Sequence, residues 1–297
     1  MHWIRYCAIL AVASFAFVVS CLAADPPTKI VLLGTGTPRP TPDRSGPATA
    51  IVVGDRAYLV DFGPGVSRRA SAAAQNTPAL DPKKISIAFV THLHSDHTTG
   101  YPDLIFTGWM MGRSELSVYG PEGIEAMTQH VLQAWQADID IRTKGMEHKP
   151  ALVVHAHDVK PGVVYKDDKV TVTAFQVAHG QWEHAFGYRF DAPDRSIVIS
   201  GDTSPSPELV AHCQPCDVLI HETFSPSATV PVMPDWPAYS AKYHTSTDQL
   251  AEIGNRTKPG LLVVYHLSGR TPDDQILREI QKTYKGKIAI GHDLEIY

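Results

Sequence analysis

The sequence predicts one α/β domain, and three observations support this fold class. Short apolar runs of strand length alternate along the chain with longer segments of helical character. The chain has 297 residues and 43% hydrophobic content, which is enough for one large core. No linker of low complexity divides its early half from its late half. We therefore expect one domain over residues 24–297, preceded by a separate segment at residues 1–23.

The first half begins with an apolar run that Gly34-Thr-Gly-Thr-Pro38 ends. Gly54-Asp55 is a favourable turn pair and predicts a hairpin. Pro121 suits the first turn of a helix. Residues 138–150 have no clear period and are expected to form a mobile loop over a site. Strands are expected at 29–33, 48–53, 57–61, 85–91 and 116–119, and helices at 66–75, 102–111 and 121–137.

The second half opens with a β-rich region and ends in mixed strands and helices. Strands are expected at 151–155, 163–165, 169–178, 185–190, 196–200, 217–222 and 261–266, helices at 206–212, 247–256 and 273–284, and a final strand pair at 287–290 and 294–297.

Residues 1–23 have the features of a secretory signal peptide. Arg5 supplies positive charge, residues 7–19 are nearly all apolar, and small residues around Ala23 suit cleavage. We expect cleavage after Ala23 and a periplasmic or secreted protein. Two alternatives place the protein at a membrane: a lipid on Cys21, which ends a sequence similar to a lipoprotein box, or an uncleaved anchor.

Two cysteines remain beyond the predicted signal, spaced as Cys213-Gln-Pro-Cys216. This spacing occurs in redox motifs and in halves of metal sites. Since no second pair completes a four-sulfur site, we expect structural cysteines near a helix end. The sequence leaves open whether they form a disulfide.

A metal site is indicated by the six residues His92-Leu-His-Ser-Asp-His97, which directly follow an apolar strand. Neutral imidazole and carboxylate groups are ligands of zinc and similar divalent ions. Three further donors follow other apolar strands in the same way, namely His179, Asp202 and His266. Because functional groups collect past the carboxyl ends of strands in α/β sheets, we expect all these donors on one rim.

The size of this donor set fits two ions. A carboxylate that bridges two metals, with three donors on each side, is typical of two-metal hydrolases, whose ions lie roughly 3.5–4 Å apart. All the donors are nitrogen or oxygen, so zinc is the first expectation, with manganese and iron as alternatives. The predicted metal ligands are His92, His94, Asp96, His97, His179, Asp202 and His266.

These motifs resemble those of the metallo-β-lactamase superfamily, whose mark is His-x-His-x-Asp-His. Within it, Leu33-Gly-Thr-Gly-Thr-Pro38, Gly201-Asp-Thr203 and Tyr243-His-Thr-Ser-Thr247 resemble the ribonuclease Z-like branch, which includes arylsulfatases and small phosphodiesterases. The resemblance covers nearly the whole mature chain and implies a four-layer αββα sandwich.

The same resemblance implies roles for individual residues. His92, His94 and His179 would hold the first metal, and Asp96, His97 and His266 the second, with Asp202 between them. Asp61 would fix the orientation of a ligand histidine. Asp96 would also orient the attacking hydroxide, and His244, held by Glu222, would protonate the leaving group.

The expected partner is a small-molecule ester, and no tRNA or other nucleic acid. Ribonuclease Z proteins carry a tRNA-gripping arm between the third histidine motif and Gly-Asp-Thr, and here residues 180–200 leave no room for it. The formal charge of −5, near −6 without Arg5, argues in the same direction. The sequence leaves open whether the protein forms a homodimer.

The expected function is hydrolysis of phosphodiesters or aryl sulfate esters by a secreted dinuclear enzyme. A first alternative is hydrolysis of a lactone, thioester or β-lactam by the same metals. A second alternative is a metal-loaded carrier without catalysis, although a carrier has no need of His244 and Glu222. Four tryptophans are candidates for lining an aryl pocket, and each has core packing as its competing interpretation: Trp109, Trp135, Trp182 and Trp236.

Overall fold

The computed structural model describes residues 27–227 and 235–297. The predicted signal at residues 1–23, its cleavage point and Cys21 therefore lie outside the described residues. Within the described part of the chain, no helix combines the length and the apolar character needed to span a membrane.

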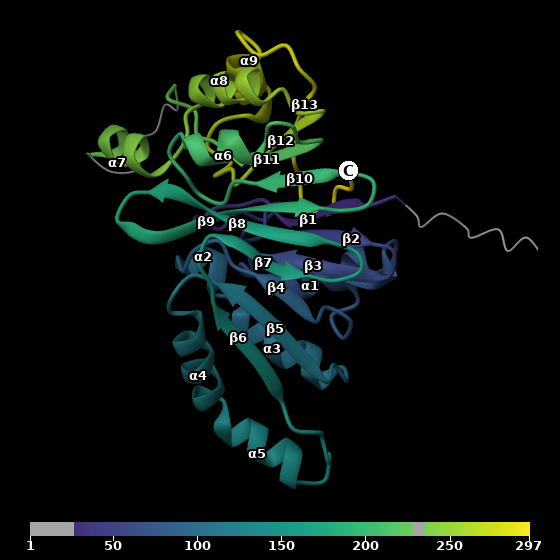
Figure 1. Ribbon diagram of the computed structural model, residues 1–297. Coiled ribbons are helices and arrows are strands. Elements are labelled where there is room, and N and C mark those ends of the chain that lie inside the picture. The colour runs from purple at the N-terminus through teal and green to yellow at the C-terminus, as the bar shows by residue number, and fades with distance from the viewer. Residues whose placement is uncertain (1–26, 228–234) are drawn as a thin grey trace, which may run out of the picture.

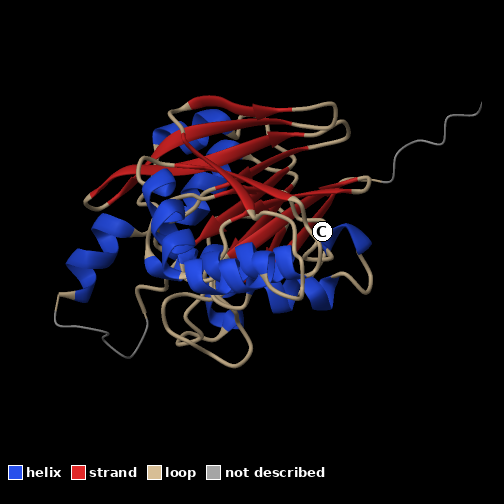
Figure 2. Ribbon diagram, turned by 90° about the horizontal axis from the view of Figure 1, so that it is seen from below, coloured by secondary structure: helices blue, strands red, loops and turns tan. Residues whose placement is uncertain are grey.

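Two β-sheets lie face to face, and helices cover their outer faces (Figures 1 and 2). The first sheet has the order β1 (Lys29–Gly34), β2 (Ala48–Val53), β3 (Arg56–Val60), β4 (Ile87–Phe89), β5 (Glu115–Gly120) and β6 (Val153–Asp158). The second has the order β13 (Ile288–Ile290), β12 (Leu261–Tyr265), β11 (Val218–Glu222), β10 (Ser196–Ile199), β9 (Trp182–Asp191), β8 (Thr171–His179) and β7 (Gly162–Lys166).

The helices divide between the two sheets according to their apolar faces. Three helices pack on the outer face of the first sheet: α1 (Val66–Ala73), α3 (Tyr101–Met110) and α4 (Ile124–Ala134). The helices α6 (Pro207–His212), α8 (Thr247–Thr257) and α9 (Asp273–Ile280) pack on the second. The remaining helical segments are η1 (Pro78–Leu80), α2 (Ser95–Thr98), α5 (Gln136–Lys144) and α7 (Trp236–Tyr243).

The central core lies between the two sheets and is rich in aromatic side chains. Phe89 of β4 contacts Tyr188 and Phe190 of β9, each with ring centroids 5.5 Å apart. All three side chains are fully buried, so the sheets adhere through one continuous apolar layer. The predicted four-layer αββα sandwich is thus confirmed.

Two local expectations are wrong. Residues 138–150 are largely helical rather than a loop over a site, because α5 occupies residues 136–144. Figure 1 places α5 at the tip of an extension formed with α4, away from the layers. The segment 294–297 does not pair with β13. It pairs with β1, where Tyr297 and Ile30 exchange both backbone hydrogen bonds at 2.9 and 3.0 Å.

The cysteine pair follows α6 and is joined as a disulfide between Cys213 and Cys216. Both residues are buried in the apolar layer between the second sheet and its helices. This position agrees with the structural role expected from the sequence.

Candidate metal centre and active site

The loops that follow four strands bring the seven predicted donors together. The segment after β4 runs into the single turn of α2, and together they supply four of them. His179 ends β8, Asp202 follows β10, and His266 follows β12. The side chains form two adjoining groups, and within each group the ligand atoms lie within 4.8 Å of one another. The first group contains His92, His94, His179 and Asp202, and the second contains Asp96, His97 and His266.

Three ring nitrogens of the first group converge on one point. His94 Nδ1 lies 2.9 Å from His92 Nε2 and 3.1 Å from His179 Nε2. Burial lowers the pKa of all three side chains, that of His94 to about 4. The rings are therefore neutral near pH 7, and their lone pairs are available to a metal.

The second group is more acidic, and Asp202 lies between the two groups. His266 Nε2 lies 3.3 Å from Asp96 Oδ2, and Asp96 Oδ2 lies 3.6 Å from His97 Nε2. One oxygen of Asp202 is 3.4 Å from His97 Nε2, and the other is 3.5 Å from His266 Nε2 and 4.0 Å from His179 Nε2. A carboxylate in this position can contact ions in both groups.

Hydrogen bonds outside the cluster fix the orientation of its histidines. His97 Nδ1 donates to Asp61 Oδ2 at 2.8 Å, and His179 Nδ1 donates to the Tyr243 carbonyl at 2.7 Å. His92 Nδ1 lies 3.0 Å from the Thr91 hydroxyl. In each ring Nε2 is therefore left facing the cluster, as metal binding requires.

Two buried polar atoms support the fit to a cation. Among the described residues, no group forms a hydrogen bond with His97 Nε2 or with Asp202 Oδ1, and both atoms are shielded from solvent. Burial opposes charge on His97, but Asp202, Asp61 and Asp96 outweigh it and raise the pKa well above its usual range. The surroundings of His97 Nε2 and Asp202 Oδ1 therefore favour positive charge, and the residues present fit a divalent ion.

The backbone at the cluster adopts conformations that are uncommon for side-chain-bearing residues. Asp61 and His266 have φ angles of 62° and 56°, in the left-handed region. Gly63 permits the close approach of the Asp61 loop to α2, because a Cβ there would lie 2.5 Å from the Asp96 carbonyl oxygen. The chain thus holds these side chains in place at a local conformational cost.

Replacing Asp61 with Asn is expected to lower metal affinity by about 10- to 100-fold, the usual effect of losing a carboxylate that orients a ligand histidine. Asp61 also accepts hydrogen bonds from the backbone and hydroxyl of Thr91. Competition with a chelating dye measures the affinity. Asp55→Asn is the matched control, since Asp55 is 93% exposed. Equal affinities in both variants would contradict the assignment.

His244 and Glu222 form a hydrogen-bonded pair beside the cluster. Glu222 is buried, and its Oε1 lies 3.2 Å from His244 Nδ1 and accepts the backbone N–H groups of Thr203 and Thr245 at 3.2 and 3.1 Å. Burial opposes protonation of His244, but the Glu222 carboxylate outweighs it and raises the pKa to about 9. His244 is therefore protonated near neutral pH and can donate a proton.

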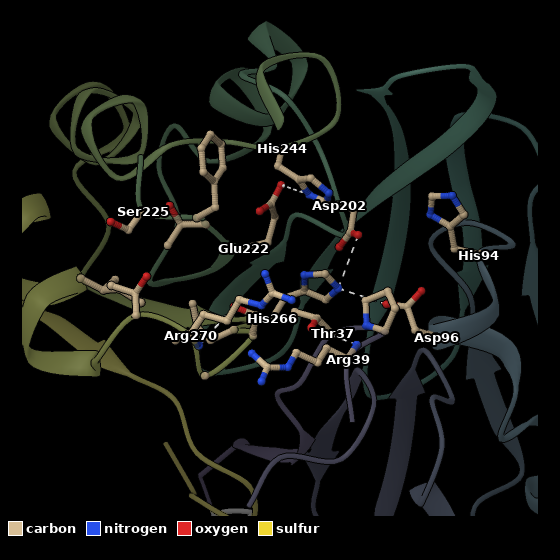
Figure 3. A pocket seen from close by; sticks show the side chains of 18 of the residues that line it. Thr37, Arg39, His94, Asp96, Asp202, Glu222, Ser225, His244, His266 and Arg270 are labelled. Atoms are coloured by element: carbon tan, nitrogen blue, oxygen red, sulfur yellow. Dashed lines mark hydrogen bonds and ion pairs between the residues drawn. The ribbon is translucent and has the colours of Figure 1, made fainter. Parts of the chain in front are cut away.

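A cavity of about 350 Å³ joins this pair to the metal cluster (Figure 3). Four of the cluster residues line it: His94, Asp96, Asp202 and His266. His244 and Glu222 line it as well, and the His244 ring centroid lies 6.1 Å from that of His266. A substrate in the cavity can therefore reach both sets of groups.

The sequence did not single out Arg39 and Arg270, which also line the cavity. Of the four tryptophans, Trp109 is core, and Trp135 lies on the outer extension. Trp182 contacts the cluster directly, because its indole N–H donates to His94 Nε2 at 2.6 Å. Trp236 begins α7. Strand-end spacing could have indicated Trp182, which pairs with His179 in the β8–β9 register.

A four-layer sandwich with this cluster defines a metal-dependent hydrolase. The sequence matches a family model described as "Beta-lactamase superfamily domain" over residues 56–267. It is also 30% identical over 277 residues to a protein named ribonuclease Z from Mycobacterium bovis, covering 90% of this chain and 96% of that one. The chain therefore belongs to the metallo-β-lactamase superfamily, in its ribonuclease Z-like branch.

Solved structures show the same fold. The metallo-β-lactamase fold protein YhfI from Bacillus subtilis superposes with a TM-score of 0.71 at 16% identity, over 92% of this chain and 100% of that one. The short form of human tRNase Z superposes with a TM-score of 0.64 at 21% identity, over 91% of this chain and 98% of that one.

The expectation that the protein has no tRNA or other nucleic-acid partner is wrong. It is overturned by the relative named ribonuclease Z, which this chain matches over 90% of its length. The physical reason is that net charge averages the whole surface, whereas the cavity carries two arginines of its own. The short segment 180–200 excludes a tRNA-gripping arm between His179 and Gly201 only, and it does not alter the cavity.

Proposed function

We propose that this protein is a dinuclear metal-dependent phosphodiesterase whose substrates include RNA. The observation that carries the proposal is one cavity that contains both the seven-donor cluster and the His244–Glu222 pair. The first set suits activation of water, and the second suits protonation of an alkoxide that leaves. RNA is included because the relatives similar to this chain are named ribonuclease Z.

The proposed roles follow from the positions of the side chains. His92, His94 and His179 would hold one ion, Asp96, His97 and His266 the other, and Asp202 both. When bound, two ions would make activated water available at neutral pH and would neutralise charge on the phosphoryl oxygens. Asp96, beside His266 on the cavity wall, orients the attacking water and accepts its proton. His244 donates a proton to the leaving oxygen, and Glu222 fixes its ring.

Metal identity and location belong to the same proposal. The nitrogen and oxygen donors favour zinc, with manganese and iron as the alternatives. Residues 1–23 favour export, so we propose a secreted or periplasmic enzyme. The mass of the protein recovered from each cell fraction tests this location, and full-length protein in the cytoplasm alone would contradict it.

A panel of esters tests the function. We expect hydrolysis of bis-p-nitrophenyl phosphate and of a short RNA, loss of both activities with a chelator, and recovery on addition of zinc or manganese. The panel includes p-nitrophenyl sulfate, because a sulfate ester presents a similar tetrahedral centre. Absence of chelator-sensitive turnover of both phosphodiesters would reject the proposal.

The same panel separates the alternative functions. It contains a lactone, a thioester and a β-lactam, and faster turnover of any of these than of the phosphodiesters favours acyl chemistry. A protein that binds two metals and hydrolyses none of the substrates would instead act as a metal carrier.

A further inference from the structure

The cavity is lined by more than the metal cluster and the His244–Glu222 pair. Three apolar residues also line it: Phe224, Leu267 and Ile276. Leu267 and Ile276 are nearly fully buried and belong to the core under the second sheet. These two side chains are therefore fixed by packing, and the apolar part of the lining can contact a ligand ring.

Arg39 and Arg270 also line the cavity and bring positive charge to it. Arg39 is in the loop after β1, and Arg270 is in the loop after β12, so two distant parts of the chain meet here. Figure 3 shows both side chains on the His266 side of the cavity, with His94 at the opposite side. Among the described residues, no carboxylate forms an ion pair with Arg39.

The acidic side chains of the cavity are engaged elsewhere. Asp96 and Asp202 face His266 at 3.3 and 3.5 Å, and Glu222 faces His244 at 3.2 Å. They do not neutralise Arg39, which is exposed. A guanidinium group presents a planar set of donors that matches the oxygens of a phosphate. The cavity lining thus includes both apolar side chains and guanidinium groups that can bind an anion.

His244 fixes the direction in which a substrate lies. It lines the cavity together with the two arginines, and a proton donor must contact the oxygen that leaves. The leaving group therefore lies near His244, in the cavity that the two arginines also line. A leaving nucleoside would place its base against the apolar side chains of the lining and its next phosphate near the arginines.

We propose that Arg39 and Arg270 form a subsite for a second phosphate, so that the enzyme prefers substrates whose leaving group is a phosphorylated nucleoside. This inference rests on the proposed phosphodiesterase function and narrows it to nucleotide chains. It distinguishes the two phosphates of a substrate: one lies at the metal cluster and reacts, and the other lies at the arginines and positions the leaving group.

Inhibition of bis-p-nitrophenyl phosphate hydrolysis tests the subsite. Adenosine 3′,5′-bisphosphate is expected to inhibit about 10- to 100-fold more strongly than adenosine 3′-phosphate or 5′-phosphate, as charge-assisted hydrogen bonds imply. In Arg39→Gln and Arg270→Gln this ratio is expected to approach one. Arg39→Lys should retain part of it, because charge remains without the paired donors.

The control is Arg68→Gln, which removes an equal charge from an exposed position on α1 outside the cavity and should retain the full ratio. Two results would overturn the subsite. One is equal inhibition by the bisphosphate and the monophosphates in the unaltered enzyme, and the other is an unchanged preference for the bisphosphate in both Arg39→Gln and Arg270→Gln. If the protein does not hydrolyse the diester, the proposed function fails separately. Calorimetry on the metal-loaded protein then measures the affinities of the three nucleotides, and the ratio of these affinities replaces the ratio of inhibition strengths.

Discussion

Replacing Asp202 with Asn is expected to lower kcat/KM for phosphodiesters by more than about 1,000-fold, well beyond the usual effect of changing a residue outside the ligand set. Asp202 is buried between the two histidine groups, where its carboxylate oxygens approach His179 of the first group and His97 and His266 of the second. Burial opposes its ionisation, but His266 and His97 outweigh this and hold its pKa well below the usual range. An amide has nearly the same shape but lacks the negative charge that two ions would share.

Elemental analysis and steady-state kinetics measure this effect together. The metal content should fall below about two ions per chain as activity is lost, while circular dichroism shows an unchanged fold. Asp55→Asn, at an exposed turn, removes the same charge and should retain both metal and activity. Full activity of Asp202→Asn would show that the cluster does not use a bridging carboxylate.

Replacing His244 with Ala is expected to lower kcat for RNA by about 100- to 10,000-fold, the range attributed to general acid catalysis. The effect depends on the leaving group, because an alkoxide needs a proton whereas p-nitrophenolate is stable without one. Loss of activity towards bis-p-nitrophenyl phosphate should therefore be much smaller. Glu222→Gln should follow the same pattern, since Glu222 keeps His244 protonated.

The comparison of the two substrates identifies the role. A merely structural defect would lower both activities equally, and a loss confined to metal content would appear in the elemental analysis. His130→Ala is the control, because His130 is exposed on α4. Equal losses for RNA and the aryl diester would show that His244 does not act as the proton donor.

Much of the metal cluster was predictable, because its donors follow strands that the sequence marks clearly. The apolar runs before His92, Asp202 and His266 are short, buried and bounded by loops, so their ends could be placed in advance. The contribution of Asp61 followed from family resemblance alone, since a carboxylate after one strand has no pattern of its own.

Other features depend on packing that the sequence does not encode locally. Helix α5 has no buried residue and hence no apolar period, which explains why residues 138–150 were expected to be a loop. The pairing of Tyr297 with Ile30 joins strands from opposite ends of the chain. Arg39 and Arg270 meet only after two loops fold together, and isolated arginines in loops have no recognisable spacing.

The division of the donors between the sheets has a consequence for folding. The loop after β4 in the first sheet supplies four donors, and three strands of the second sheet supply His179, Asp202 and His266. Ions held by both sets would act as cross-links between layers that otherwise adhere through apolar contact. Because ligands that bind only the assembled state stabilise it by mass action, metal release and separation of the layers would be linked equilibria. Metal supply in the compartment where the protein folds would then add to the stability that the apolar layer between the sheets provides.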